Sequence, residues 1–312
     1  MRITEVAVDA ANLDAVLARS YEEFIGNPDY YADFRLRFNL GISDPLIDVK
    51  YYEISEGSSI WASFMLVFNR MNFNDSQIKI CFLTQVIVSK EYRGLGITYK
   101  LSKYAEEMAV NEGAGITFVI ARRAVKDLYG KLGFVGFSHF SELELGPVPG
   151  IEKTAVNLMQ EPKSSDLRKI MKLHEASYRK LNFNLMRSEE SIQNLIESPN
   201  YTIKISENES FYLVSTLKTI VEIGMNSDTI SSEIIATIIH EGFDLIRINR
   251  NHEIFRIGVE MGLVEKKRFE LREGHLLRIH RSNLSPLQLS ELEDFIINPG
   301  AQFAEIPEAD QW

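Results

Sequence analysis

The stretch EYRGLGIT at residues 91–98 places an arginine and two glycines directly before a segment with helical spacing of apolar residues. A helix N-terminus exposes unpaired backbone N–H groups and the positive end of the helix dipole, so it binds anions such as phosphate. Glycines beside it let a ligand approach the main chain, because they carry no Cβ. The residues from Arg93 to Thr98 therefore predict a phosphate-binding corner. For an isolated Gly-x-Gly, a tight turn without a ligand is the alternative.

Two common nucleotide-binding motifs do not fit this corner. The dinucleotide fingerprint needs a third glycine at position 99, where the sequence has Tyr99. A Walker loop needs four residues and then Gly-Lys-Ser/Thr after its first glycine, which the stretch does not contain. The ligand expected at this corner is therefore neither a Rossmann-type dinucleotide nor a nucleotide in a Walker loop.

Two blocks of the sequence together resemble the GNAT superfamily of acyl-CoA-dependent N-acyltransferases. VIVSKEYRGLGIT resembles the signature Arg/Gln-x-x-Gly-x-Gly/Ala, with Arg93 first, Gly96 fourth and Thr98 in place of the small sixth residue. DLYGKLGFVGF at 127–137 resembles the block Leu-Tyr-x-Lys-x-Gly-Phe, and its tyrosine is Tyr129. The resemblance covers 82–137 by motif and 1–145 by the order of elements.

The resemblance implies a site for acyl-CoA, with acetyl-CoA as the expected co-substrate. It implies that backbone amides at the corner bind the coenzyme A diphosphate and that the preceding strand pairs its backbone with pantetheine. The residues to which this assigns cofactor binding are Val86, Val88, Arg93, Gly94, Leu95, Gly96, Ile97 and Thr98.

The resemblance also assigns Tyr129 a catalytic role, as the acid that protonates the departing thiolate. A phenol with a pKa near 10 can supply that proton. Packing of the ring in the core is the alternative for this tyrosine. No general base is identified. The polar candidates are Thr84 and Gln85 on the long strand, and Tyr52 and Glu53 on the neighbouring hairpin.

The elements that must position these residues alternate between strands and helices. The corner is expected to join a long strand to an amphipathic helix, in an α+β fold whose mixed, mostly antiparallel sheet is flanked by helices. The expected strands of the first half are 3–8, 48–54, 60–69, 77–88, 116–121 and 134–145, and the expected helices are 10–24, 30–40, 98–110 and 125–132.

The cluster GPVPG at 146–150 predicts a boundary between two domains, 1–147 and 148–312. The second half is expected to repeat the element order of the first, as a degenerate GNAT-like copy. An offset of about 129 residues aligns the glycines that end two helices in each half, Gly113 with Gly242 and Gly133 with Gly262. The same offset places no glycines opposite Gly94 and Gly96, so only the first half is expected to bind acyl-CoA.

The expected elements of the second half end in a strand pair near 263–280 and a C-terminal helix. In chain order they are helices at 165–179 and 188–198, strands at 201–205, 211–216 and 219–224, a helix at 230–241, a strand at 244–248, a helix at 252–261, the strand pair and a helix at 286–297.

Composition excludes several classes of function. The net charge of −10 disfavours nucleic acid, whose affinity depends on Lys and Arg contacts to phosphate. The single cysteine, Cys81, excludes an internal disulfide and is expected to be a buried small apolar residue. The longest apolar run, at 60–68, is too short to span a membrane. A cytoplasmic protein without a metal site is expected, since the histidines show no metal-ligand spacing.

These observations favour an N-acyltransferase that moves an acetyl group from acetyl-CoA directly to a primary amine, on a small molecule or a peptide. A catalytically silent CoA-binding regulatory protein is the alternative, and an interaction scaffold is the third possibility. A homo-oligomer is compatible with any of these.

Overall fold

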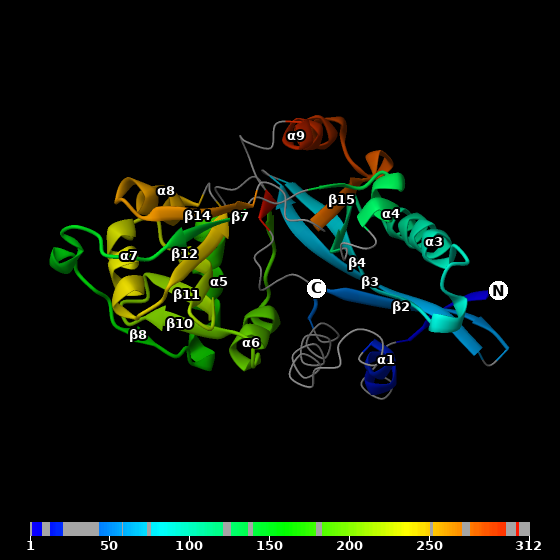
Figure 1. Ribbon diagram of the computed structural model, residues 1–312, viewed down its shortest axis with the longest axis horizontal. Helices are drawn as coiled ribbons and strands as arrows, with labels where there is room; N and C mark the ends of the chain where they lie inside the picture. The colour runs from blue at the N-terminus through cyan, green and yellow to red at the C-terminus, as the bar shows by residue number, and fades with distance from the viewer. Residues whose placement is uncertain are drawn as a thin grey trace. The chain divides into compact units, whose positions relative to one another are not determined.

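The chain folds into two compact units that exchange segments, as described by a computed structural model (Figure 1). The first unit comprises Met1–Phe137 and Glu273–Asp294, and the second Ser138–Arg272 and Phe295–Gln311. The helix expected at 30–40 lies outside the described residues. These are 2–7, 13–20, 44–57, 59–73, 76–120, 126–136, 140–178, 183–249, 252–269, 275–297 and 304–305.

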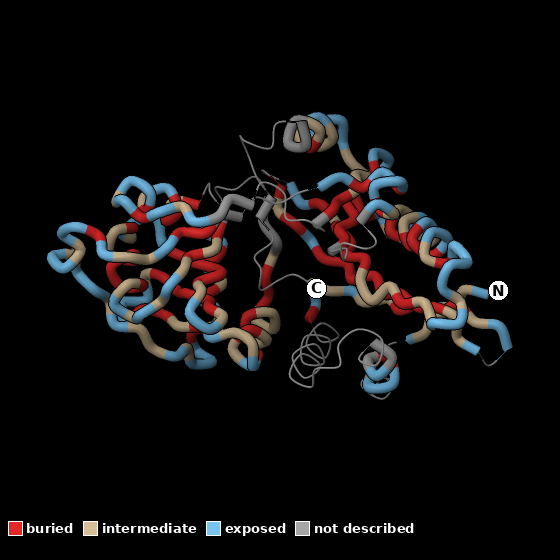
Figure 2. The backbone as a smooth tube through the Cα atoms, in the orientation of Figure 1, coloured by how far each residue is buried: buried red, intermediate tan, exposed pale blue. Residues whose placement is uncertain are grey.

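The first unit is built on a mixed sheet; along the seven strands named below, the described pairing of β4 with β5 is parallel and the other described pairings are antiparallel. Helices α3 (Ile97–Asn111) and α4 (Lys126–Lys131) pack on one face, where apolar residues of β3 and α3 belong to one buried cluster. Figure 2 shows the buried stretches of these elements. Helix α1 (Leu13–Ser20) and most of α9 (Pro286–Ile297) also belong to the first unit. In sheet order the strands are β1 (Arg2–Val6), β2 (Asp48–Glu56), β3 (Ser59–Phe73), β4 (Ser76–Val88), β5 (Ile116–Ile120), β15 (His275–Ile279) and β6 (Val135–Gly136).

The second unit has a sheet with the same central arrangement, including a parallel pair, β12 with β13. Helices α7 (Ser231–His240) and α8 (Glu253–Glu260) pack with one apolar cluster, and α5 (Leu167–Tyr178) and α6 (Glu189–Glu197) with another. Outside this sheet, β9 (Phe183–Leu185) pairs with β16 (Ala304–Glu305). In sheet order the strands are β14 (Val264–Phe269), β7 (Phe140–Glu144), β13 (Leu245–Asn249), β12 (Thr219–Met225), β11 (Phe211–Thr216), β10 (Thr202–Ser206) and β8 (Met159–Gln160).

The tandem repeat predicted from the glycine spacing is confirmed at the ends of four helices. Gly113, Gly133, Gly242 and Gly262 each end a helix with φ between 79° and 93°. Each glycine amide donates to the carbonyl three residues earlier, and the next amide donates to the carbonyl five residues earlier. This is the Schellman hydrogen-bonding pattern. The two halves therefore share a helix architecture as well as an order of elements.

The pairing of the last strands of each half differs from the expectation. The segment 134–145 is not one strand, because β6 and β7 belong to different sheets, and the strands near 263–280 do not pair with each other. Strand β15 lies between β5 and β6, whereas β7 lies between β13 and β14. Strands β15 and β7 occupy the same position in equivalent sheets. Each can therefore form the backbone hydrogen bonds that this position requires, although it comes from the other half of the sequence. A linear division at 147/148 does not describe this arrangement.

Candidate functional site

The glycine corner has the backbone geometry that an anion site requires. Gly94 and Gly96 both have positive φ, 82° and 71°, and Gly96 is the N-cap of α3. The first backbone hydrogen bond of the helix runs from Lys100 N to Gly96 O, at 3.3 Å. The amides of residues 97–99 precede that bond, at the positive end of the helix dipole. A Cβ built at either glycine would meet nothing within 4 Å, so there is open space beside the main chain.

The corner is fastened to the end of β4 by side chains. Arg93 Nε donates to the carbonyl oxygen of Val88 at 3.0 Å. The rings of Trp61 and Tyr92 stack with their centroids 4.6 Å apart. These contacts fix the strand-to-helix turn, so Arg93 shapes the corner rather than only adding positive charge to it.

Among the described residues, the last parallel pair of β4 with β5 is Leu83 with Val119, whereas β4 continues to Val88. The amide of Ser89 donates to Trp61 on β3. Because backbone groups alternate sides along a regular strand, those of Val88 face away from β3. The side chains of Val86 and Val88 pack against the core.

Tyr129 belongs to the same buried cluster as Ile97 of the corner and Leu83 of β4. Its ring packs edge-on against Phe134, with centroids 5.5 Å apart. Burial raises the pKa of the Tyr129 phenol, so the hydroxyl keeps its proton at neutral pH. The structure therefore brings the three parts of the predicted site onto one cluster, with a tyrosine that is able to donate a proton.

Two other groups near the site are ruled out as bases or nucleophiles by their surroundings. Burial and the Glu5 carboxylate raise the pKa of Tyr52, whose hydroxyl donates to Glu5 at 3.1 Å. Tyr52 therefore remains protonated and does not act as a base. Cys81 is fully buried, as predicted, and burial raises the pKa of its thiol, so no thiolate forms.

A bulge interrupts the pairing of β3 with β4 at the level of the last β4–β5 pair. Met65 pairs with Thr84 and Ser63 with Ile87, which leaves Gln85 and Val86 opposite a single residue of β3. Gln85 has a φ of 53°. The sequence named Gln85 only as one of several candidates for a base. Its backbone conformation could not have been predicted, because no glycine or turn motif marks it.

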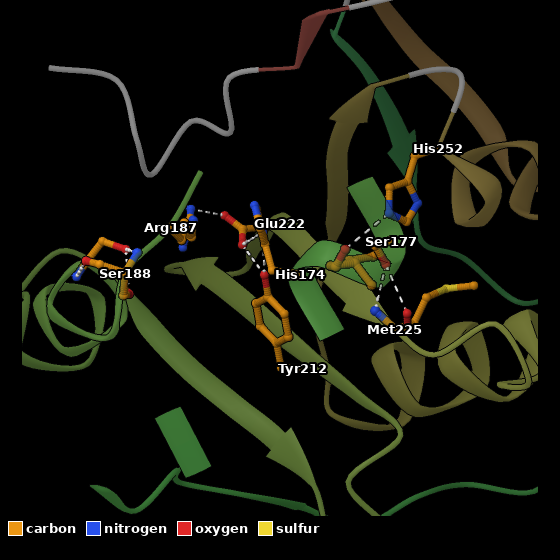
Figure 3. A network of polar contacts seen from close by, with 10 residues as sticks. His174, Ser177, Arg187, Ser188, Tyr212, Glu222, Met225 and His252 are labelled. Carbon is orange, nitrogen blue, oxygen red and sulfur yellow. Dashed lines mark hydrogen bonds and ion pairs between the residues drawn. The ribbon is translucent and has the colours of Figure 1, made fainter. Parts of the chain in front are cut away.

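The second unit has no glycine corner before its equivalent helix, α7. It contains instead a buried polar network between α5 and the strands β11 and β12 (Figure 3). Glu222 accepts hydrogen bonds from Arg187, at 2.6 Å, and from the Tyr212 hydroxyl. His174 Nδ1 lies 3.0 Å from the same hydroxyl. Sequence reasoning missed this network, although a lone glutamate within the apolar run TIVEIGM was a signal for it.

The network keeps Glu222 ionised inside the protein. Burial alone would raise the pKa of this carboxyl, but the charge of Arg187 and the hydrogen bonds from His174 and Tyr212 outweigh it and lower the pKa to about 2. Arg187 is held in turn by the negative charge of Glu222, so each ion compensates the other. The network therefore fastens residues of α5, β11, β12 and the segment before α6 to one another.

Within the described part of the chain, no group of three or more His, Cys, Asp or Glu side chains could hold a metal ion. Over the same residues, no helix combines the length and apolar character needed to cross a membrane.

Residues 64–134 match the family model described as acetyltransferase (GNAT) family. This segment runs from within β3 to Phe134, just before β6, and it includes the corner and Tyr129. The chain thus contains a domain of the GNAT family. No curated protein sequence matches the chain.

Solved structures share the fold over most of the chain, at low sequence identity. A GCN5-related N-acetyltransferase from Kribbella flavida has a TM-score of 0.65 at 15% identity, over 89% of this chain and 71% of that one. A probable N-acyltransferase from Enterococcus faecalis has a TM-score of 0.68 at 12% identity, over 89% and 72%. The N-myristoyltransferase of Saccharomyces cerevisiae, solved with bound myristoyl-CoA, gives 0.53 at 8% identity, over 89% and 78%. The chain therefore shares the fold of these structures over most of its length.

Proposed function

We propose that this protein is an N-acyltransferase that moves an acetyl group from acetyl-CoA to a primary amine, and that the first unit carries the site. One observation carries the proposal: the end of β4, which follows the last described pair with β5, leads directly into a corner of amides that precede the first hydrogen bond of α3. An extended thioester with a diphosphate at one end matches both features. Such a ligand offers an anion for the amides and peptide-like groups for the strand edge.

In this reading the corner binds the diphosphate through amides from Leu95 to Thr98. The backbone groups of Val86 and Val88 bind the pantetheine arm. The carbonyl of Val88 already accepts a hydrogen bond from Arg93, so its amide is the group available to the arm. The family match over 64–134 supports this reading, as does the bound myristoyl-CoA in the yeast protein of similar fold.

Transfer is direct, from thioester to amine. The amine nitrogen forms a bond to the thioester carbonyl carbon, and the carbon–sulfur bond breaks with its electron pair on sulfur. Tyr129 gives its phenolic proton to this thiolate, and the nitrogen loses a proton that restores the phenol through solvent. The raised pKa of Tyr129 keeps the proton in place until the thiolate forms.

The test is an acetyl-transfer assay over a panel of amines, with CoA binding measured by calorimetry on the same proteins. Gly96→Trp is expected to weaken CoA binding by at least about tenfold, because the indole fills the space beside the amides. Gly150→Trp is the matched control. Gly150 has a similar φ of 78° and equally open surroundings, but it lies in the second unit. Normal CoA binding by Gly96→Trp would show that the corner is not the cofactor site.

Tyr129→Phe is expected to lower kcat about 10²-fold and to leave CoA affinity unchanged, as loss of a general acid does. Tyr52→Phe is its control, a buried tyrosine of the same core whose hydroxyl contacts Glu5. Binding of CoA without transfer to any amine, in the native protein, would identify a regulatory CoA-binding protein instead.

A further inference from the structure

Gln85 adopts a backbone conformation that its side chain disfavours. Among the described residues, three that are not glycine have positive φ: Gln85, Glu209 and Leu217. Glu209 and Leu217 lie in the turns of the hairpins β10–β11 and β11–β12, where such values are common. Gln85 lies within strand β4. Non-glycine residues held in this region cluster at functional sites, and an observed outlier is a sound start for a hypothesis of function.

The carboxamide of Gln85 also has a polar atom that the fold leaves unsatisfied. Its Oε1 is buried and accepts no hydrogen bond from the described part of the protein. Across the same bulge, the hydroxyl oxygen of Ser63 on β3 is likewise buried without a described partner. Buried oxygens of this kind are unfavourable unless a donor reaches them. Folding alone therefore does not explain why the bulge carries polar side chains.

The second unit provides an internal comparison for this position. Its strand β12 also has a bulge, because Ser215 pairs with Ile220 and Val214 with Glu222. The residue left over is Val221, which is fully buried in an apolar cluster. The bulge in β12 comes earlier in the register with the parallel neighbour than the bulge in β4, and its apolar residue shows that a bulge of this sheet does not require a carboxamide. Gln85 is thus a property of the first unit, the unit with the glycine corner.

The position of Gln85 relates it to the reacting end of the ligand rather than to its phosphate end. The corner lies beyond the C-terminal end of β4, and Val88 and Val86 lead back from it along the strand. An arm that follows these two residues reaches Gln85 next, two residues after the last pair with β5. The thioester of a bound acyl-CoA therefore ends near the Gln85 carboxamide, and the attacking nitrogen must arrive there too.

We propose that Gln85 Oε1 accepts a hydrogen bond from an N–H of the acceptor amine and orients its nitrogen toward the thioester carbon. This inference rests on the proposed function, and it assigns a residue that contacts the acceptor. A neutral carboxamide oxygen accepts from an amine or an ammonium group without removing its proton. Gln85 therefore binds and orients the acceptor, and it is not the base.

The test compares Gln85→Leu and Gln85→Glu with the native chain in steady-state kinetics. Acetyl-CoA is saturating, and spermidine, glucosamine and glycinamide are each varied as the amine. Gln85→Leu is expected to raise KM for the amine about 10- to 100-fold, as loss of a hydrogen bond to a charged donor does, with CoA affinity unchanged. Gln85→Glu keeps an acceptor oxygen and is expected to retain a KM near the native value. Gln77→Leu, at an exposed glutamine of the same strand, is the control.

An unchanged KM in Gln85→Leu would overturn the proposal. A loss of CoA affinity as large as the rise in KM would also overturn it, because it would show that Gln85 Oε1 accepts a hydrogen bond from a pantetheine amide. A second measurement needs no substrate. The urea midpoint of Gln85→Leu is expected to equal or exceed the native value, because an unsatisfied buried oxygen is removed. A clearly lower urea midpoint would show that Gln85 Oε1 accepts a hydrogen bond within the fold, and it would contradict the proposal. This result can be obtained even if no amine in the panel is acetylated, so it tests the role of Gln85 separately from the proposed function.

Discussion

At the scale of single residues, burial acts on Tyr129 and Glu222 in opposite directions. Tyr129 lies in an apolar cluster, and burial raises its pKa and favours its neutral form, against the smaller opposing effect of a hydrogen bond with Ser102. Glu222 is equally buried, but Arg187 and two further hydrogen-bonding groups favour its charged form. The first unit thus holds a neutral buried phenol, and the second holds a buried ion pair.

The Glu222 carboxylate is expected to stabilise the protein only above its folded-state pKa. Its pKa falls from 4.5 to about 2 on folding, so the stabilisation is complete above about pH 4.5 and is lost as the pH falls toward 2. Glu222→Gln is expected to lower the free energy of unfolding at pH 7 by about 3 kcal/mol, because Arg187 keeps a buried charge without its counter-ion. It is also expected to remove this part of the acid dependence. Urea unfolding measured from pH 2 to pH 7 checks both effects.

Glu144→Gln is the control for this experiment. Its ion pair with Lys266 is about half exposed, at 3.3 Å, so its loss is expected to change the free energy of unfolding by less than about 1 kcal/mol. An acid dependence in Glu222→Gln equal to that of the native chain would contradict the assignment of the network.

At the scale of elements, strand β15 is held at its C-terminal end by His280. The His280 amide donates to Gly115 at 2.8 Å, and its ring nitrogen Nε2 lies 2.8 Å from the hydroxyl of Thr117 on β5. Burial, with the nearby charge of Arg278, lowers the pKa of His280 to about 4. The imidazole is therefore neutral at pH 7 and fits between the strands without a charge.

This histidine predicts a weakening of the first unit in mild acid. The unfolded chain binds the proton first, at a pKa near 6.5, so stability is full above that pH and declines as the pH falls toward 4. The decline reaches roughly 3 kcal/mol at most. His280→Gln is expected to remove it. Urea midpoints followed by Trp61 fluorescence, in a Trp312→Phe background, report on this unit.

Replacing His240, which is exposed at the end of α7, is the matched control and is expected to leave the pH dependence unchanged. If the midpoint of the native chain is the same at pH 7 and pH 4.5, the predicted effect of His280 is wrong.

Local sequence was sufficient to predict most elements but not all their partners. The long strand and helix on either side of the corner lie within two residues of their expected bounds, because apolar periodicity and a glycine at the helix end are local signals. Strands β7 and β15 could each pair in either sheet, because the positions that they fill are equivalent. No local sequence signal determines which sheet each strand joins. The glycines predicted the turn at 94–96, whereas the conformation of Gln85 and the contacts of Glu222 depend on the packed structure.

At the scale of the whole molecule, each unit is complete only with a strand from the other half of the sequence. Residues 1–147 contain β7, which belongs to the second sheet, and lack β15, which separates β5 from β6. A linear domain cut from the chain therefore retains a strand without its sheet and a sheet with a missing strand.

A chain of residues 1–147 is expected not to fold cooperatively, because β5 loses its antiparallel partner and β6 loses its only partner in the sheet. A chain that joins residues 1–137 through a flexible linker to 273–294 is expected to restore a sharp urea transition and, under the proposed function, CoA binding. Circular dichroism and calorimetry on the two chains make the comparison. A cooperative, CoA-binding 1–147 chain would show that β15 is dispensable.

The exchange also sets the order in which the protein matures on the ribosome. The first half emerges first, but its sheet stays open between β5 and β6 until residues 275–279 have been synthesised, which follow β14 of the second unit. Domains that are contiguous in sequence close one after another as they emerge. Here the nascent first half keeps two strand edges exposed while most of the second unit is synthesised, so ribosome-associated chaperones have an interval in which to bind it.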